Sequence, residues 1–139
     1  MPKILAIDYG EKRVGLAAAD TETLLPLPLA ILDNKGMKKL IEEIMKICQK
    51  EAISEIVVGL PTGLAGKPTK QTEKTKKFIA GLKQKITLPI GEQSEIFTSR
   101  QARKMFEEAG IKKRRVDASA AVLILNDYLE KTTPLEAQN

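Results

Sequence analysis

The stretch KILAID at Lys3–Asp8 decides how this chain folds. It consists of an apolar run that ends in an acid, a pattern typical of a central strand covered on both faces. The next residues, Tyr9–Lys12, include Gly10 and predict a turn, and Arg13–Ala19 (RVGLAAA) is apolar again. The two apolar runs therefore predict a β-hairpin.

Beyond this hairpin, strand patterns and helix patterns alternate. Pro26 and Pro28 have no N–H to donate to a ladder, so the apolar run around them predicts an edge strand. The expected strands are Leu24–Leu32, Glu55–Leu60 and Leu88–Ser94, and the expected helices are Lys35–Glu51, Thr69–Lys85, Thr98–Ala109 and Asp117–Glu130. This order predicts an α/β fold with a five-stranded mixed sheet (antiparallel hairpin and edge strand plus two parallel strands) flanked by about four helices.

Length and composition restrict the possible classes of protein. The 139 residues, 42% of them hydrophobic, suffice for a single domain over residues 1–139, with a tail after about residue 131 that we expect to be disordered. No apolar run approaches the ~18 residues of a membrane span, and no signal peptide is expected because an acid interrupts the first apolar run. The single cysteine, Cys48, cannot form an internal disulfide and indicates a reducing compartment.

The chain contains no histidine. This excludes Ser-His-Asp and Cys-His nucleophile systems, histidine bases and histidine-containing metal sites. A Walker-type phosphate loop is excluded as well, although GLAGKPT at Gly63–Thr69 is superficially similar. Pro61 stands where that motif needs its first glycine, and Lys67 is followed by Pro68.

Two candidate acids stand where expected strands end. Asp8 follows the most apolar strand, at the edge where α/β sheets collect ligands, although an aspartate there could also cap the turn through Gly10. Glu95 follows the last expected strand. Glu92 is its rival, and a solvated surface acid is the alternative interpretation of either.

A third candidate acid, Asp117, opens the last expected helix. It shares one helical face with Ala121, Ile124 and Tyr128, so an acid points where core residues point. The alternative is that Asp117 is the N-cap of the helix. The small residues around Ala121 favour close approach to the sheet, which would bring Asp117 near Asp8.

Clustered carboxylates would require a cation. Two of them ~4 Å apart repel by ~4 kcal/mol at an effective dielectric constant of ~20. Hard oxygen ligands without histidine or cysteine select Mg²⁺ or Mn²⁺, and such ions promote phosphodiester hydrolysis.

Positive charge is concentrated in the middle of the chain. Residues 67–115 contain 14 basic and 5 acidic residues, whereas residues 1–66 have a net charge of −1 and residues 116–139 of −3. Such a concentration favours binding of a phosphate backbone, although a solvated lysine-rich face is the alternative. Together with an acidic cation site it indicates a nuclease.

Four segments carry a family resemblance: ILAIDYGEKRVGLAAAD at Ile4–Asp20, IVVGLP at Ile56–Pro61, SEIFTSRQA at Ser94–Ala102 and RRVDASAAVLILNDYL at Arg114–Leu129. They resemble the bacterial YqgF family of Holliday junction resolvases and pre-16S ribosomal RNA nucleases. The resemblance implies a ribonuclease H-like fold, a cytoplasmic location, Mg²⁺ or Mn²⁺, and endonuclease activity during maturation of the small-subunit ribosomal RNA 5′ end.

By matched position, the resemblance implies that the catalytic and metal-binding acids are Asp8, Glu95 and Asp117. It implies a basic pair at Lys12 and Arg13, and the basic run Lys112, Lys113, Arg114 and Arg115 is a further candidate for phosphate binding. Ser94 and Ile96 depart from the family pattern, which usually has an acid and an arginine at these two positions.

Other functions stay open at this stage. A Holliday junction resolvase acting on branched DNA in recombination and repair would need a two-fold dimer, and the sequence leaves monomer and homodimer open. A non-catalytic nucleic-acid-binding factor in ribosome assembly or transcription would use the same basic surface. A kinase-like phosphotransferase would need a second domain, which 139 residues cannot provide.

Overall fold

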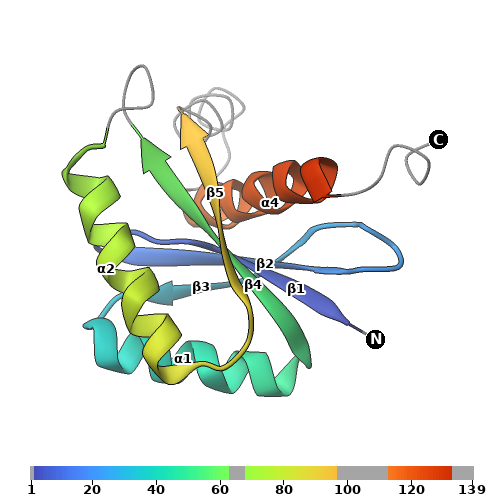
Figure 1. Cartoon of the computed structure of the whole chain (residues 1–139), viewed down its shortest axis with the longest axis horizontal. Helices are drawn as coiled ribbons and strands as arrows, with labels where there is room; N and C mark the ends of the chain where they lie inside the picture. The colour runs from blue at the N-terminus through green and yellow to red at the C-terminus, as the bar shows by residue number, and fades with distance from the viewer. Residues whose placement is uncertain (1, 63–67, 97–112, 133–139) are drawn as a thin grey trace.

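The chain forms a five-stranded sheet with helices on both faces (Figure 1). This computed structural model describes residues 2–62, 68–96 and 113–132. The elements, in chain order, are β1 (Lys3–Asp8), β2 (Arg13–Asp20), β3 (Leu27–Asp33), α1 (Met37–Lys50), β4 (Ile53–Thr62), α2 (Lys70–Lys85), β5 (Ile90–Ile96) and α4 (Lys113–Thr132).

The strand order is β3-β2-β1-β4-β5, so β1 lies at the centre. β1 pairs antiparallel with β2, and β2 pairs antiparallel with β3. On its other side β1 pairs parallel with β4, which pairs parallel with β5. The predicted mixed sheet with its hairpin and proline-containing edge strand is thereby confirmed. It follows that the carboxyl ends of β1, β4 and β5 meet at one edge of the sheet.

Alternate residues of β1 contribute to two separate cores. Leu5 and Ile7 pack against α1 and α2, whereas Ile4 and Ala6 pack against α4 on the opposite face. All four side chains are at most 5% exposed. Burial on both faces explains why the strand has an unbroken apolar sequence.

Small residues form part of the contact between α4 and the sheet. Ala121 of the helix belongs to the same buried cluster as Ala6, Ala17 and Ala19 of the strands. Short side chains on both surfaces let the helix lie close to the strands while the interface stays densely packed. The predicted close approach of this helix is therefore consistent with the structure.

α4 begins at Lys113, four residues earlier than predicted. The alternative that Asp117 is its N-cap is therefore wrong, and Asp117 lies inside the helix. The extension has a simple cause, because lysine and arginine favour helices and neither glycine nor proline separates the basic run from Asp117.

The part of the chain that the structure describes contains three helices. The fourth predicted helix, Thr98–Ala109, and residues 133–139 of the tail predicted to be disordered after about residue 131 lie outside that part, whereas α4 continues to Thr132. None of the helices described is long and apolar enough to cross a membrane.

Candidate active site

Asp8 is the last residue of β1 and lies at the carboxyl edge of the sheet, partly buried. Strand alternation puts it on the same face as Ile4 and Ala6, which is the face covered by α4. Its pairing partner on β2 is Gly15, and the register that pairs Ile7 with Val58 brings Gly59 of β4 level with it. Neither strand neighbour has a side chain beyond Cα.

Glu95 occupies the corresponding edge on β5, where it pairs with Pro61 of β4. Alternation along β5 puts it on the face of Gly91, which lies next to Tyr128 of α4. Glu92 is an odd number of residues away and so belongs to the opposite face. The register therefore favours Glu95 over its rival as a partner of Asp8.

The separation of the two strand positions follows from sheet geometry. β1 and β5 are two strand spacings apart, and Glu95 lies about two residues further along its strand than Asp8. With ~4.8 Å between strands and ~3.3 Å per residue, the two Cα atoms are about 12 Å apart. The side chains of Glu95 and Asp117 themselves lie outside the described part of the structure.

The direction of α4 brings its first turns to the same edge. Near the other end of the helix, the Tyr128 hydroxyl donates a hydrogen bond to the Glu55 carboxylate, close to the start of β4. Asp117 lies eleven residues before Tyr128, about 16 Å back along the helix axis towards the carboxyl edge. It also falls in line with the buried residues Ala121 and Ile124, which contact the sheet. The backbone thus brings all three acidic positions to one edge and one face.

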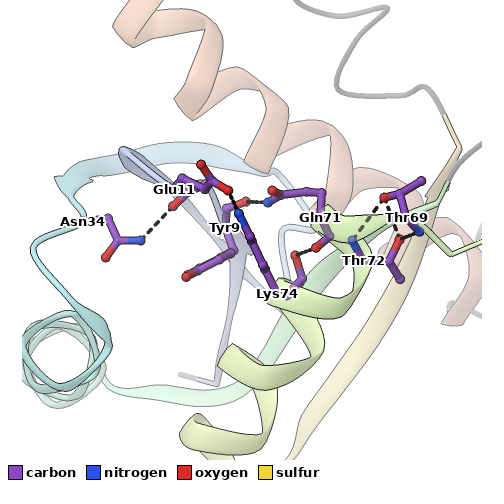
Figure 2. Close-up of polar contacts among 9 residues, drawn as sticks. Tyr9, Glu11, Asn34, Thr69, Gln71, Thr72 and Lys74 are labelled. Atoms are coloured by element: carbon purple, nitrogen blue, oxygen red, sulfur yellow. Dashed lines mark hydrogen bonds and ion pairs between the residues drawn. The ribbon is translucent and has the colours of Figure 1, made fainter.

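The turn that follows Asp8 is held from two sides (Figure 2). From the loop between β3 and α1, the Asn34 side chain donates to the Gly10 carbonyl oxygen at 2.9 Å, and the Asn34 N–H donates to the Lys12 carbonyl oxygen at 2.8 Å. From α2, the Gln71 side chain donates to the Tyr9 carbonyl oxygen at 3.3 Å. Three of the four carbonyl groups from Tyr9 to Lys12 are fixed in this way, and that of Glu11 is the exception.

Side-chain contacts complete this support. Glu11 forms an ion pair with Lys74 of α2, and the hydrogen bond and charge of Lys74 hold the pKa of Glu11 below its ordinary value. The Tyr9 ring stacks on Phe78 with ring centroids 4.4 Å apart. Because Phe78 is fully buried, the turn is anchored to the core as well as to the surface of α2.

The start of α2 is also fixed next to this edge. Thr69 and Thr72 form a capping box, in which each side chain bonds the backbone N–H of the other. The Thr72 hydroxyl also donates to the Pro61 carbonyl oxygen at the end of β4. Pro61 pairs with Glu95, so the cap connects α2 to the strand beside the second acidic position.

The predicted basic residues fall into two groups. Lys12 is exposed in the supported turn, and Arg13 is the first residue of β2, so both are close to Asp8 in the chain and in space. Lys113, Arg114 and Arg115 form the first turn of α4, whereas Lys112 lies outside the described residues. Both groups therefore belong to segments at the carboxyl edge.

The sequence did not point to Asn34, Gln71 or Lys74 as part of this site. Asn34 and Gly10 are 24 residues apart, and Gln71 and Tyr9 are 62 apart. Contacts over such separations leave no local pattern. The start of α2 is the part of this support that has a local signal in the sequence, because Thr69 and Thr72 have the spacing of a capping box.

The available donor atoms fit a hard divalent cation. Without histidine, and with Cys48 buried in the α1 core, the possible protein ligands are carboxylates. Burial raises the pKa of the Cys48 thiol to about 11, so it stays protonated at neutral pH. Among the side chains that the structure describes there is no group of three metal ligands. Asp8 is the described carboxylate among the three predicted ligands, and it lies between two glycines of the neighbouring strands.

A surface pocket of about 340 Å³ lies elsewhere. It is formed by the end of α1, the start of β4 and the segment from Lys85 to Leu88. This is the amino-terminal end of the parallel strands, opposite Asp8. The pocket is therefore separate from the acidic edge.

Comparison with known proteins identifies the family of this chain. The model of a family described as RuvX: Holliday junction resolvase matches residues 2–131. A relative from Koribacter versatilis is 38% identical over 133 residues, covering 93% of this chain and 87% of its own length. One from Maridesulfovibrio salexigens is 33% identical over 133 residues, covering 93% and 98%. Both carry the curated name "Putative pre-16S rRNA nuclease".

Solved structures show the same fold at low sequence identity. T. thermophilus RuvC in complex with a Holliday junction substrate superimposes with a TM-score of 0.57 at 12% identity, covering 94% of this chain and 96% of RuvC. The Fowlpox virus resolvase in complex with Holliday junction DNA gives a TM-score of 0.57 at 13% identity, covering 95% and 99%. The predicted ribonuclease H-like fold is therefore confirmed.

Proposed function

This chain belongs to the RuvX/YqgF family, and we propose that it is a metal-dependent endonuclease that hydrolyses phosphodiester bonds during maturation of the 5′ end of pre-16S ribosomal RNA. One observation carries the proposal. The positions of Asp8 and Glu95 share one edge and one face of the sheet, and the helix stripe that includes Asp117 runs to that edge. Acids from three distant segments would meet there.

In this proposal Asp8, Glu95 and Asp117 hold one or two Mg²⁺ or Mn²⁺ ions. A bound ion of this kind lowers the pKa of a water molecule and stabilises the charge of a leaving oxygen, which replaces the missing histidine base. A bound cation would offset the mutual repulsion of the three carboxylates. Gly15 and Gly59, on either side of Asp8, have no side chain to hinder the approach of the scissile phosphate.

The basic residues would bind and orient the phosphates around the cleaved bond. Lys12 and Arg13 are carried by the supported turn, so their backbone is fixed relative to Asp8. The run Lys112–Arg115 leads into the first turn of α4. Positive side chains are unfavourable at the start of a helix, which is the positive end of its dipole. Their presence there is better explained by a function such as phosphate binding.

A second candidate activity is the resolution of Holliday junctions, with DNA as the substrate. It is favoured by the description of the matching family and by the junction complexes of the two structural neighbours. We prefer ribosomal RNA as the substrate because the curated relatives at 33–38% identity carry the name "Putative pre-16S rRNA nuclease". We further propose that the protein acts in the cytoplasm, where precursor ribosomal RNA is processed in bacteria.

Side-by-side cleavage assays test the proposal. The purified protein is incubated with precursor 16S ribosomal RNA and with a four-way DNA junction, each with Mn²⁺ and with a chelator. We expect metal-dependent cleavage of the RNA, no cleavage with chelator, and no cleavage by the Asp8→Asn variant.

Asp20→Asn is the matched control, because Asp20 ends β2 at the opposite edge of the sheet, where its carboxylate accepts a hydrogen bond from the Glu22 N–H. This variant is expected to cleave normally. Preferred cleavage of the junction would replace RNA by DNA as the substrate. Salt-sensitive binding without any cleavage would overturn the nuclease and favour a binding factor. Full activity of Asp8→Asn would instead overturn the assignment of Asp8 to the active site.

A further inference from the structure

α2 is far more basic than its neighbour α1. Its sixteen residues contain six lysines and one glutamate, whereas α1 carries four lysines and two glutamates. All the lysines of α2 are exposed. They are Lys70, Lys74, Lys76, Lys77, Lys83 and Lys85.

Part of this charge has a structural explanation. Lys74 forms the ion pair with Glu11 that supports the turn after Asp8. Lys83 and Lys85 lie in the last turn of the helix, where positive charge is favourable for the helix dipole. These three lysines therefore have a structural role and do not by themselves indicate a binding site.

Lys70 and Lys77 have no such explanation. Lys70 is the first residue of α2, where a positive charge opposes the helix dipole, and it is one turn away from the like charge of Lys74. Neither Lys70 nor Lys77 forms an ion pair with any residue that the structure describes. Glu73 lies three residues after Lys70 and four residues before Lys77, but the described structure contains no ion pair between Glu73 and either lysine.

Their position connects them to the acidic edge. They are seven residues apart, so they lie on one face of α2, about 10 Å from each other. The core-facing residues Thr75, Phe78 and Leu82 occupy the other side of the helix. Lys70 is followed by Gln71, whose side chain contacts the turn after Asp8. The row thus starts beside the acidic edge and runs outward along the helix.

From this placement we infer that Lys70 and Lys77 form a second phosphate-binding row, which holds the backbone of the RNA beyond the cleaved bond. The inference rests on the proposed function. A duplex carries a phosphate on each strand every few ångströms of its axis, so a row about 10 Å long is long enough to contact more than one phosphate of the backbone. The row binds RNA at a distance from the chemistry and contributes affinity, not the rate of bond cleavage.

RNA binding as a function of salt tests this inference. Fluorescence anisotropy with a labelled hairpin from the precursor 16S leader, in chelator to prevent cleavage, gives the dissociation constant between about 50 and 200 mM KCl. For the double variant Lys70→Gln/Lys77→Gln we expect binding about tenfold weaker at low salt. The slope of log affinity against log salt should become shallower by about 1.5.

The matched control is Lys46→Gln/Lys50→Gln, which removes the same charge from exposed positions of α1. It is expected to leave the slope nearly unchanged. In cleavage assays, the α2 variant should raise KM and leave kcat unaltered. Urea denaturation checks that both double variants are folded under the assay conditions.

Each outcome is decisive. An unchanged slope in the α2 variant, an equal change in the α1 control, or a wild-type protein without salt-sensitive RNA binding would overturn the phosphate-binding row. These results are separable from failure of the nuclease itself. An active Asp8→Asn variant would refute the catalytic assignment while leaving the binding data on Lys70 and Lys77 intact.

Discussion

Gly10 has the strictest steric requirement of the turn that follows Asp8. A Cβ atom there would lie 2.4 Å from the carbonyl oxygen of Arg13, and that oxygen belongs to the backbone. Relief would need a shift of the turn or of β2. We therefore predict that Gly10→Ala lowers the free energy of unfolding by about 2 kcal/mol, measured by urea denaturation.

Gly91→Ala provides the control for this substitution. A Cβ at Gly91 would meet the Tyr128 ring at 3.8 Å, an ordinary contact distance. Its unfolding free energy should stay within about 0.5 kcal/mol of the wild type. A Gly10→Ala protein that is as stable as Gly91→Ala would contradict the tight turn.

Tyr128 couples the stability of the fold to alkaline pH. Its hydrogen bond to Glu55, together with burial, raises the pKa of the phenol from 10.0 to about 12. Between these values the unfolded chain loses this proton while the folded chain keeps it. The contribution to stability is therefore complete below pH 10 and is lost as the pH rises towards 12.

The chain has two tyrosines, so ultraviolet titration can isolate this group. The difference between the titration curves of the wild type and Tyr128→Phe should have its midpoint near pH 12. The variant should also be about 1 kcal/mol less stable at neutral pH, because a hydrogen bond to a carboxylate is lost. A difference curve centred on pH 10 would show that the bond to Glu55 is absent in solution.

Individual residues differ in how far the sequence predicts them. Asp8 could be assigned because the apolar run before it fixes where the strand ends. Glu95 and Glu92 could not be separated, because the last strand was expected at Leu88–Ser94 and lies at Ile90–Ile96. The face of a strand residue depends on register, and a shift of one residue reverses it. Only the pairing with β4 supplies that register.

At the level of elements, the support of the turn by α2 and the β3–α1 loop should matter for catalysis. Asn34 and Gln71 contact backbone atoms of the turn and are positioning residues. We predict that Asn34→Ala and Gln71→Ala each lower kcat for RNA cleavage by about tenfold or more with little change in KM, because small displacements of reacting groups reduce rates steeply.

Gln84→Ala controls for loss of a glutamine from the same helix, since Gln84 is exposed near the other end of α2. It should have wild-type kcat and KM. Urea denaturation shows whether each variant is folded at assay conditions. Wild-type kcat in both Asn34→Ala and Gln71→Ala would mean that the turn holds its shape without these side chains.

The boundaries of the elements were predictable where a local signal exists. α2 was expected at Thr69–Lys85 and spans Lys70–Lys85, because Thr69 and Thr72 mark its start. α4 was misplaced at its start, because Asp117 before an apolar stretch mimics a cap while the basic residues ahead of it continue the helix. Positive charge at the start of a helix opposes the helix dipole, whereas an aspartate there is favourable. Electrostatics alone would therefore also have predicted that α4 begins at Asp117.

At the level of the whole molecule, the sheet was predictable because β1 is apolar throughout and βαβ units impose parallel pairing. The small residues around Ala121 already predicted that Asp117 lies near Asp8, whereas Glu95 was assigned to the same site through the family resemblance. The three positions are far apart in the chain, and strand order, register and the direction of α4 place their backbone towards one edge of the sheet.

The central claim is that these acids form one cation site, and Mn²⁺ binding measured by isothermal titration calorimetry tests it most directly. We predict that the wild type and Asp20→Asn bind Mn²⁺ alike, whereas Asp8→Asn binds at least about tenfold more weakly, because one charged ligand is lost. If Asp8→Asn bound Mn²⁺ as tightly as the wild type, Asp8 would hold no metal and the proposed active site would be wrong.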